Sequence, residues 1–450
     1  MYDYSLMESY TLNFEAIDTE KRITFQIQEQ FQQVEGKHLL ASIHLSKLIP
    51  LEHILQIVRN LPTNFVGIDL LPFVANLPLE FLEKILAALP AHIHYLNADH
   101  LITDYLNPLS AISNEFPYDL FKKILLKVPK TIREFSFKNN LERNLPGYLE
   151  LIARYLPQVR SLDLQGNYLE QLHSKQIPGL WINLPMKISV LLLSFTPPVS
   201  RDERDTVKRD TILNQLPREI TQLILSIRDF RTNTHEQLNH CFGTLSSSVK
   251  KIQWTYEEID EPFYLVKLIK NTPETVSILD LRDLDLGSFN YCAKDIKRGK
   301  PGKLIVDIIN NIPAHVSTLL LDRNGLDSLT VEEFVLLISI IPATVTQVSL
   351  KGNNLFTNKP PSLQESILER IMPYTQSSVA SDGISRIILD DNDLNYIALA
   401  YPLEKSLGHD IIYKIGRDLG SPITFFKSAA KNSDSEDPSD SDSLDTIIAP

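Results

Sequence analysis

The sequence predicts an α/β fold in which a right-handed solenoid curves into a horseshoe, with a parallel β-sheet on its concave side and helices outside. Three observations support this prediction. A short strand motif recurs about every 28 residues, and helix-like apolar stripes ending in Leu-Pro or Ile-Pro precede it. The chain, at 450 residues, also exceeds the size at which one compact core usually keeps growing. Repetition is one way to build such a chain.

The strand motif reads apolar-x-x-apolar-x-apolar-x-x-Asn-x-Leu and is clearest in residues 316–326 and 345–355. Its copies begin near residues 62, 90, 129, 157, 185, 217, 246, 273, 313, 342 and 381. Most starts are 27 to 32 residues apart, three gaps are 39 or 40, and a divergent copy lies near residue 40. The chain therefore contains about twelve units.

Each unit is expected to be a short strand, a turn and a helix. Alternate strand positions point inward, and the Asn can bond backbone groups where the chain leaves the strand. Helix starts are indicated by the capping-box spacings Thr234-x-x-Gln237, Thr330-x-x-Glu333 and Ser362-x-x-Glu365. The proline after each helix ends it. One unit cannot bury its own leucines, so stacking must do it.

This pattern resembles the leucine-rich-repeat family, in its ribonuclease-inhibitor-like version with 28-residue α/β units. The resemblance covers residues 37–395, which we interpret as the solenoid domain, and weakens where Leu284 replaces the motif Asn. It implies a one-layer curved sheet backed by helices.

The two ends of the chain lack the repeat motif and have different sequence patterns. In residues 1–36 the segments 10–14 and 22–27 alternate like strands, which predicts a β-hairpin cap over the open end of the solenoid. Residues 396–427 are expected to form a helical cap. Residues 428–450 are rich in Ser and Asp, which predicts a disordered acidic tail.

Three insertions interrupt the period, at residues 102–115, 287–301 and 374–382. We expect surface loops, which is where insertions in repeat arrays usually lie. The alternative is that they decorate one edge of the horseshoe and touch a partner. The middle insertion holds Cys292 and a basic run at residues 294–300, which favours a solvated charged loop over a phosphate site.

Charge and composition exclude several classes of function. The formal net charge is −12, so the chain lacks the clustered cations that nucleic acid or an anionic membrane surface would need. No apolar stretch reaches about 18 residues, so no membrane insertion is expected. The N-terminus lacks the pattern of a signal peptide, and 2 cysteines cannot make a disulfide framework. We expect a monomer in a cytosol-like compartment.

No catalytic motif, cofactor site or metal site is indicated. Cys241 falls on an apolar helix face and is expected to be buried. Cys292 has Asp295 three residues on, which is not the Cys-x-Asp spacing of the ubiquitin-ligase domains that some bacterial leucine-rich-repeat effectors carry. An enzyme with a cryptic site, using Cys292, remains an alternative.

Histidines also fail to suggest a metal site. His92 and His94 would point to one face of a strand, with His100 nearby, yet no recognisable spacing supplies further ligands. We interpret them as surface histidines.

Binding is expected on the concave sheet, because the residues between the inward leucines all point there. Exposed apolar residues near the middle would supply affinity, and charges around them specificity. The candidate residues are Asp163, Leu192, Ser194, Ile224, Ser226, Gln253, Asp280, Arg282, Leu320, Asp322, Ser349, Lys351, Ile388 and Asp390.

The leading interpretation is a non-enzymatic scaffold that binds a protein. The Ser-rich acidic tail, closing on Leu444, Ile447 and Ile448, resembles the translocation signals of type IV secretion effectors, and the repeats resemble the leucine-rich-repeat effectors of Legionella. That resemblance implies a protein made in the bacterial cytoplasm, delivered to the host cytosol and bound to a host protein. The alternative is an adaptor that recruits a host enzyme, such as a ubiquitin ligase, to a bound target.

Overall fold

The computed structural model describes most of the repeat region. The described residues are 8–14, 39–45, 50–70, 77–113, 115–140, 145–172, 175–195, 203–256, 262–288, 304–356, 359, 364, 367, 386–389 and 393. The helical cap expected at 396–427, the tail 428–450, the insertion 374–382 and the residues Cys292 and Asp390 lie outside them.

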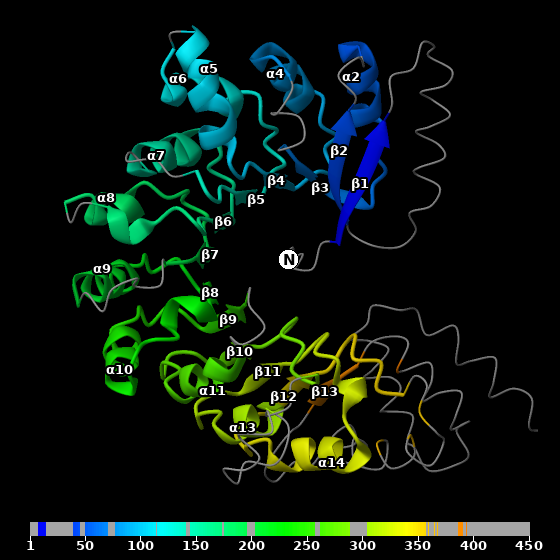
Figure 1. The fold of residues 1–450 in the computed structure, drawn as a ribbon, viewed down its shortest axis with the longest axis vertical. Helices are drawn as coiled ribbons and strands as arrows, with labels where there is room; N and C mark the ends of the chain where they lie inside the picture. The colour runs from blue at the N-terminus through cyan, green and yellow to red at the C-terminus, as the bar shows by residue number, and fades with distance from the viewer. Residues whose placement is uncertain are drawn as a thin grey trace, which may run out of the picture.

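One parallel sheet runs through the described residues, with its strands in sequence order from β1 to β13. The strands line the inner side of an open arc (Figure 1). They are β1 Glu8–Phe14, β2 Leu39–Leu45, β3 Phe65–Asp69, β4 Tyr95–Asn97, β5 Glu134–Ser136, β6 Ser161–Asp163, β7 Val190–Leu193, β8 Gln222–Ser226, β9 Lys251–Thr255, β10 Ile278–Asp280, β11 Thr318–Leu320, β12 Gln347–Ser349 and β13 Arg386–Ile388.

Helices form the outer layer of the arc (Figure 1). They are α2 Leu51–Arg59, α4 Leu79–Ala87, α5 Asn107–Ser113, α6 Pro117–Leu125, α7 Leu145–Tyr155, α8 Ile177–Ile182, α9 Glu203–Asn214, α10 His235–Gly243, α11 Pro262–Lys270, α13 Leu304–Asn310 and α14 Val331–Ile340. A helix is wider than the spacing between neighbouring strands, so helices outside and strands inside give the arc its curvature. The predicted solenoid architecture is confirmed.

The core lies between the sheet and the helices. The inward strand positions are fully buried, as in Leu279, Leu319 and Val348, which are 0 % exposed and in register on neighbouring strands. Helix α14 adds its apolar stripe, including Phe334 and Leu337. Stacking of the units therefore buries the apolar side chains that a single unit would leave exposed.

The prolines predicted to end the helices also build the turn before each strand. In these turns the proline carbonyl accepts a hydrogen bond from the backbone N–H three residues on, as from Val316 to Pro313 (3.1 Å) and from Val345 to Pro342 (2.9 Å). The capping boxes at Thr234 and Thr330 are both formed.

Buried asparagines join consecutive units where the chain leaves the strand. The Asn353 side-chain amide donates to the carbonyls of Leu321 and Leu350, and its Oδ1 accepts from the N–H groups of Asn324 and Leu326. Asn324 repeats this arrangement one unit earlier. The predicted role of the motif Asn is confirmed.

The same bonding occurs at Asn140, which stands at the Asn position of the strand motif in the third copy. Its Oδ1 accepts from the N–H of Ile102, and its own N–H donates to Oδ1 of Asn167. Two asparagine ladders therefore form, one toward each end of the arc.

Between these ladders, a buried polar cluster replaces the asparagine in holding the chain where it leaves the strand. Arg209 on α9 donates to the Asp229 carbonyl and to Oδ1 of Asn233 at 3.1 and 3.0 Å, and lies 4.7 Å from the Phe230 ring centroid. The Asp229 carboxylate accepts the N–H of Phe195. The guanidinium thus fixes the 3₁₀ helix Ile227–Phe230 in units that lack the asparagine.

Two expectations differ from the structure. Glu8–Phe14 is a strand, but it pairs in parallel with β2, so it is the first strand of the solenoid sheet rather than part of a separate hairpin. Parallel pairing continues the sheet without a tight turn. The second arm expected at 22–27 lies outside the described residues.

The insertion at 102–115 is helical rather than a loop. A π-helix, Leu101–Leu106, runs directly into α5. Ile102, Tyr105 and Leu106 are buried, and the Tyr105 hydroxyl donates to the Leu77 carbonyl at 2.9 Å. Apolar side chains at helical spacing therefore anchor this insertion in the core, and the loop prediction is wrong there.

Candidate functional site

The concave face consists of rows of side chains that run across the strands. Because Leu and Phe residues point inward at alternate positions, the residues between them point to the concave side. The first row holds the residue between the two inward apolar positions that end each strand motif. It is in register throughout and comprises Asp69, Asn97, Ser136, Asp163, Leu192, Ile224, Gln253, Asp280, Leu320, Ser349 and Ile388.

The second row lies two residues after the first, at the ends of β8 and β9 in Ser226 and Thr255 and just beyond the strand in the other units. Its backbone groups continue the ladder in places, for example from the N–H of Asp283 to the carbonyl of Asp322 (3.1 Å) and from the N–H of Arg323 to the carbonyl of Lys351 (2.8 Å). The described members of this row are Asp99, Lys138, Gln165, Ser194, Ser226, Thr255, Arg282, Asp322 and Lys351.

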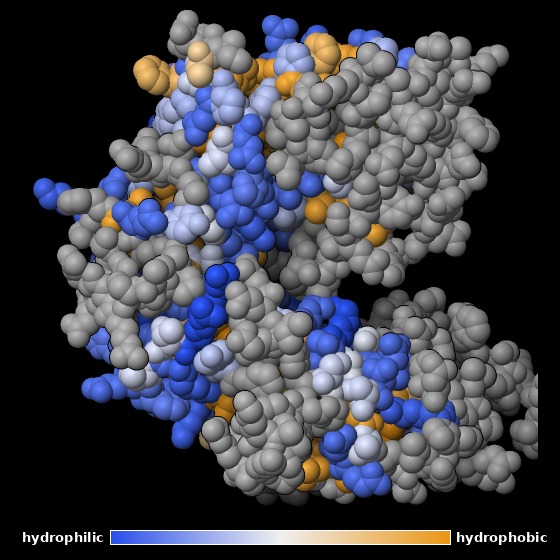
Figure 2. Space-filling view, viewed as in Figure 1, coloured by the Kyte–Doolittle hydropathy of each residue, from blue (hydrophilic) through white to orange (hydrophobic). Residues whose placement is uncertain are grey.

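Many candidate residues are less exposed than the sequence suggested. Ile224 is 5 % exposed, whereas Leu192, Leu320 and Ile388 are half-buried. Asp163, Ser226, Gln253, Asp280, Arg282, Asp322 and Ser349 are buried, while Ser194 and Lys351 are half-buried. The expectation of a freely exposed apolar stretch is therefore wrong for Ile224. Among the described residues seen in Figure 2, hydrophilic surface dominates the inner side of the arc, and hydrophobic surface forms smaller separate patches.

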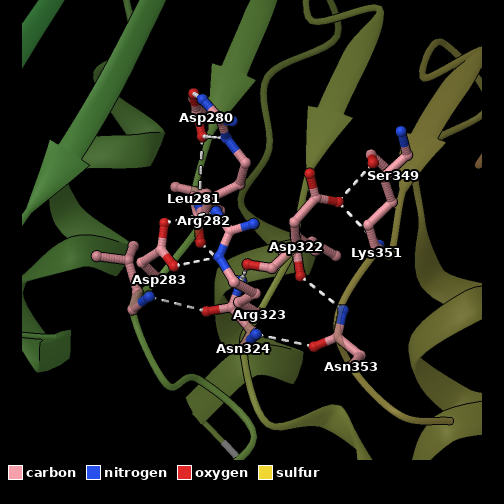
Figure 3. Close-up of polar contacts among 12 residues, drawn as sticks. Asp280, Leu281, Arg282, Asp283, Asp322, Arg323, Asn324, Ser349, Lys351 and Asn353 are labelled. Carbon is pink, nitrogen blue, oxygen red and sulfur yellow. Dashed lines mark hydrogen bonds and ion pairs between the residues drawn. The ribbon is translucent and has the colours of Figure 1, made fainter. Parts of the chain in front are cut away.

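A charged cluster lies across β9 and β10. The Asp280 carboxylate is fully buried and accepts from the Arg282 guanidinium in two hydrogen bonds, one of 2.7 Å from Nε (Figure 3). Lys251 Nζ approaches it from β9 at 2.8 Å. Burial alone would raise the pKa of Asp280, but the two cations hold it below its usual value. This carboxylate is compensated within the chain.

Asp322 is bonded differently. Its carboxylate accepts from the Ser349 hydroxyl and from the backbone N–H of Lys351 at 2.9 Å (Figure 3). Burial raises the pKa of Asp322 because these hydrogen bonds and the nearby arginines offset only part of the desolvation.

The same constellation occurs near the other end of the sheet. Asp99 accepts from the Ser136 hydroxyl at 2.5 Å and from the backbone N–H of Lys138 at 2.8 Å. In both places the serine and the lysine are two residues apart in the next unit, although the acid precedes the serine by 37 residues here and by 27 residues at Asp322. Burial likewise raises the pKa of Asp99.

Lys138 also contacts the next unit. Its ammonium lies 3.0 Å from the Asp163 carboxylate on β6. Burial raises the pKa of Asp163 to about 6, because Lys138 and the Gln165 N–H only partly offset the desolvation and Asp99 repels the charge. Nearby cations and hydrogen bonds thus compensate Asp99 and Asp163 less than they compensate Asp280.

A bidentate ion pair lies just beyond the strands. Arg323 donates from Nε and Nη2 to the two carboxylate oxygens of Asp283 at 2.6 and 2.9 Å (Figure 3). Both residues have left-handed backbone, with φ of 53° and 61°. Both side chains are more than one-third exposed, so the pair can meet a partner at the rim of the face.

Sequence reasoning missed a third row on the concave face. It comprises Gly67, Tyr95, Glu134, Ser161, Val190, Gln222, Lys251, Ile278, Thr318 and Gln347, in register two residues before the first row. Lys251 shows that the row matters, because it pairs with Asp280. The strand alternation already placed this row on the concave side, so its signal was present in the motif.

Chemistry-bearing residues elsewhere are placed as follows. Cys241 is buried, and desolvation raises the pKa of its thiol. His94 and His92 precede β4 rather than lying within it, and His94 Nδ1 lies 3.1 Å from the Thr131 carbonyl. Within the described ranges, no group of three or more His, Cys, Asp or Glu side chains could hold a metal ion. No helix in the described part is long and apolar enough to cross a membrane.

Comparison with known proteins gives a structural likeness only. No family model matches the chain, and no curated protein matches it. Among solved structures, a leucine-rich repeat-containing protein, LegL7 from Legionella pneumophila, is similar with a TM-score of 0.51 and 19 % identity, over 72 % of this chain and 95 % of that one. The chain therefore has the fold of a leucine-rich-repeat protein.

Proposed function

We propose that this protein acts by binding rather than by catalysis, as a scaffold that holds another protein on its concave sheet. The observation that carries this proposal is the in-register arrangement of the first row over β3 to β13, which presents polar and apolar side chains on one rigid surface. The asparagine ladders hold the units together and so preorganise that surface.

The interface would combine apolar contacts with charged specificity. Leu192 and Leu320 are half-buried and can lose their remaining exposed area to a partner. The pair Asp283–Arg323 at the rim can select among partners more than it can add affinity.

A pair of variants tests the location of the interface. Leu192→Glu with Leu320→Glu changes the concave face, while Ile224 stays unchanged because a charge at a 5 % exposed position would perturb the sheet. Ile182→Glu with Met186→Glu is the matched control, since these side chains are 81 % and 85 % exposed at and after the end of α8.

Affinity capture from animal-cell lysate, with both variants beside the wild type and quantitative mass spectrometry as the readout, distinguishes the outcomes. We expect proteins that saturate the wild type and the α8 variant but are lost from the concave variant. Retention by the concave variant and loss from the α8 variant would place the interface on the outer side and favour the adaptor alternative. Activity that is lost when Cys292 is alkylated would favour an enzyme.

We further propose that the chain is a secreted bacterial effector whose partner is a host protein. The repeat texture and the acidic Ser-rich residues 428–450 support this proposal. The protein would pass from the bacterial cytoplasm to the host cytosol as a monomer. A translocation assay with an adenylate-cyclase fusion in a secreting bacterium tests it, with and without residues 428–450, and light scattering tests the monomer. Equal delivery to host cells with and without a functional secretion system would contradict it.

A further inference from the structure

Charge is distributed unevenly along the concave face. Over β3 to β6 the three rows hold Asp69, Asp99, Glu134 and Asp163, against the single cation Lys138. Beyond the centre, the two carboxylates Asp280 and Asp322 are accompanied by Lys251, Arg282 and Lys351. Within the described residues, the first of these zones is acidic and the second is close to neutral or basic.

The carboxylates of the two zones also differ in how many cations contact them, and the acidic zone has fewer. Asp280 contacts two cations, and its pKa is held below the usual value. Asp163 contacts one, and its pKa is raised to about 6 by burial and by the repulsion from Asp99. Additional positive charge would therefore stabilise Asp99 and Asp163 within the β3–β6 zone, whereas Lys251 and Arg282 already compensate Asp280.

The two zones are separated by an apolar centre. Val190, Leu192 and Ile224 point to the concave side from β7 and β8, with Leu192 opposite Asp163 on one side and Ile224 on the other. Leu192 keeps exposed area. The hydroxyl Oγ of Ser226, on a residue only 5 % exposed, has no hydrogen-bond partner in the described structure. Such a hydroxyl is costly to leave unpaired, so a polar group of a bound chain would be favoured here.

We propose that the concave face recognises a polypeptide segment in which lysine or arginine side chains adjoin a short apolar run. The cations lie over the carboxylates of β3 to β6, and the apolar side chains lie over β7 and β8. This proposal rests on the function proposed above and adds the chemistry of the partner.

The dimensions suit a short segment. Five strand spacings of ~4.8 Å separate β3 from β8, a distance of about 24 Å. An extended chain that rises ~3.3 Å per residue covers this distance with about seven or eight residues. Nucleic acid is a poor alternative occupant, because its phosphates would be repelled by the β3–β6 carboxylates.

Two synthetic probes test the assignment. Both are fluorescein-labelled 12-residue peptides that share one half containing Leu and Ser. The other half carries four lysines in the first peptide and four glutamates in the second. Fluorescence anisotropy is measured against the full chain at low salt and at about 0.5 M salt, where exposed charge attraction is largely screened. We expect the lysine peptide to bind at least tenfold more tightly than the glutamate peptide, and the preference to fall at high salt.

Three variants locate the contacts. Asp69→Lys should weaken the lysine peptide at least fivefold, because it reverses a half-buried charge of the acidic zone, and Leu192→Ser should weaken both peptides. Glu274→Lys makes the same charge change at an exposed turn residue and should leave binding unchanged. Thermal melts establish that each variant is folded, and an unfolded Asp69→Lys protein would be replaced by Asp69→Asn.

Equal or tighter binding of the glutamate peptide, an unaffected Asp69→Lys variant, or failure of both peptides to bind would overturn the proposal. None of these outcomes bears on whether the concave variant loses protein partners in lysate capture. The charge assignment can therefore fail while the proposed scaffold function stands.

Discussion

The Lys138 ammonium lies 3.0 Å from the Asp163 carboxylate and joins β5 to β6 across the concave face. The lysine side chain is 35 % exposed and the aspartate side chain 8 %, so the anion loses more hydration than the cation. One lysine does not offset that loss, and the pKa of Asp163 is raised to about 6. This carboxylate therefore links the stability of the sheet to pH.

Asp163→Asn should change how stability depends on pH. The folded pKa lies above the ordinary 3.8, so the folded state favours the protonated carboxyl. Its stabilising contribution is complete below pH ~3.8 and is lost as the pH rises through about 6. Relative to the variant, wild type should thus lose up to about 3 kcal/mol between pH 4 and pH 7.5, since one pKa unit is ~1.4 kcal/mol. Urea unfolding at several pH values measures it.

Asp280→Asn is the matched control, with the opposite sign. The pKa of Asp280 is lowered, so its contribution is present above the unfolded value of about 3.9 and is lost as the pH falls below that value. The difference between wild type and this variant should stay constant from pH 5 to 7.5. Parallel pH profiles for the Asp163 variant and the Asp280 variant would contradict both assignments.

Asn353→Leu should uncouple neighbouring units. The side chain is fully buried and makes four hydrogen bonds to backbone groups of two units, so its loss leaves several of them unsatisfied. We expect a destabilisation of about 3 kcal/mol, measured by chemical unfolding, with faster amide exchange at Asn324. The exposed Asn239 on α10 provides the control, since Asn239→Ala should change stability by less than about 0.5 kcal/mol.

Gly287→Ala should be destabilising because two turns pass very close to each other. A Cβ at Gly287 would lie 2.2 Å from the carbonyl oxygen of Gly325, and a backbone atom cannot swing away as a side chain can. We expect a cost of about 1–3 kcal/mol, measured by thermal unfolding.

Gly179→Ala is the comparison for that substitution. Gly179 lies within α8 and has no atom within 4 Å of an added Cβ. Alanine there should raise stability by about 0.5–1 kcal/mol. Equal effects of the two alanines would show that the close approach at Gly287 is relaxed without cost.

Local rules account for much that the sequence predicted correctly. The repeat period and the inward Leu positions follow from strand alternation, so the first row of the concave face could be written from the sequence and is in register in the structure. The buried Asn324 and Asn353 and the capping box at Thr330 depend on chemistry within a few residues or one repeat. Such features need no knowledge of distant packing.

The wrong expectations involve neighbours that are remote in sequence. Glu8–Phe14 could pair with any available edge, and only the assembled sheet selects β2 as its parallel partner. Tyr105 anchors a helical insertion by bonding to Leu77, 28 residues earlier. Ile224 is 5 % exposed although Leu192, its neighbour in the same row, is half-buried, so the motif position alone does not set exposure.

The sequence by itself determined the repeat, the solenoid and the residues that line its concave side, because a period of about 28 residues repeats the same local preferences along the chain. Only the tertiary structure decided which of those residues are accessible and which charges are compensated. Asp163 and Asp280 occupy the same motif position, yet the pKa of one is raised and that of the other lowered. The physical reason is that desolvation and ion pairing depend on the units stacked on either side.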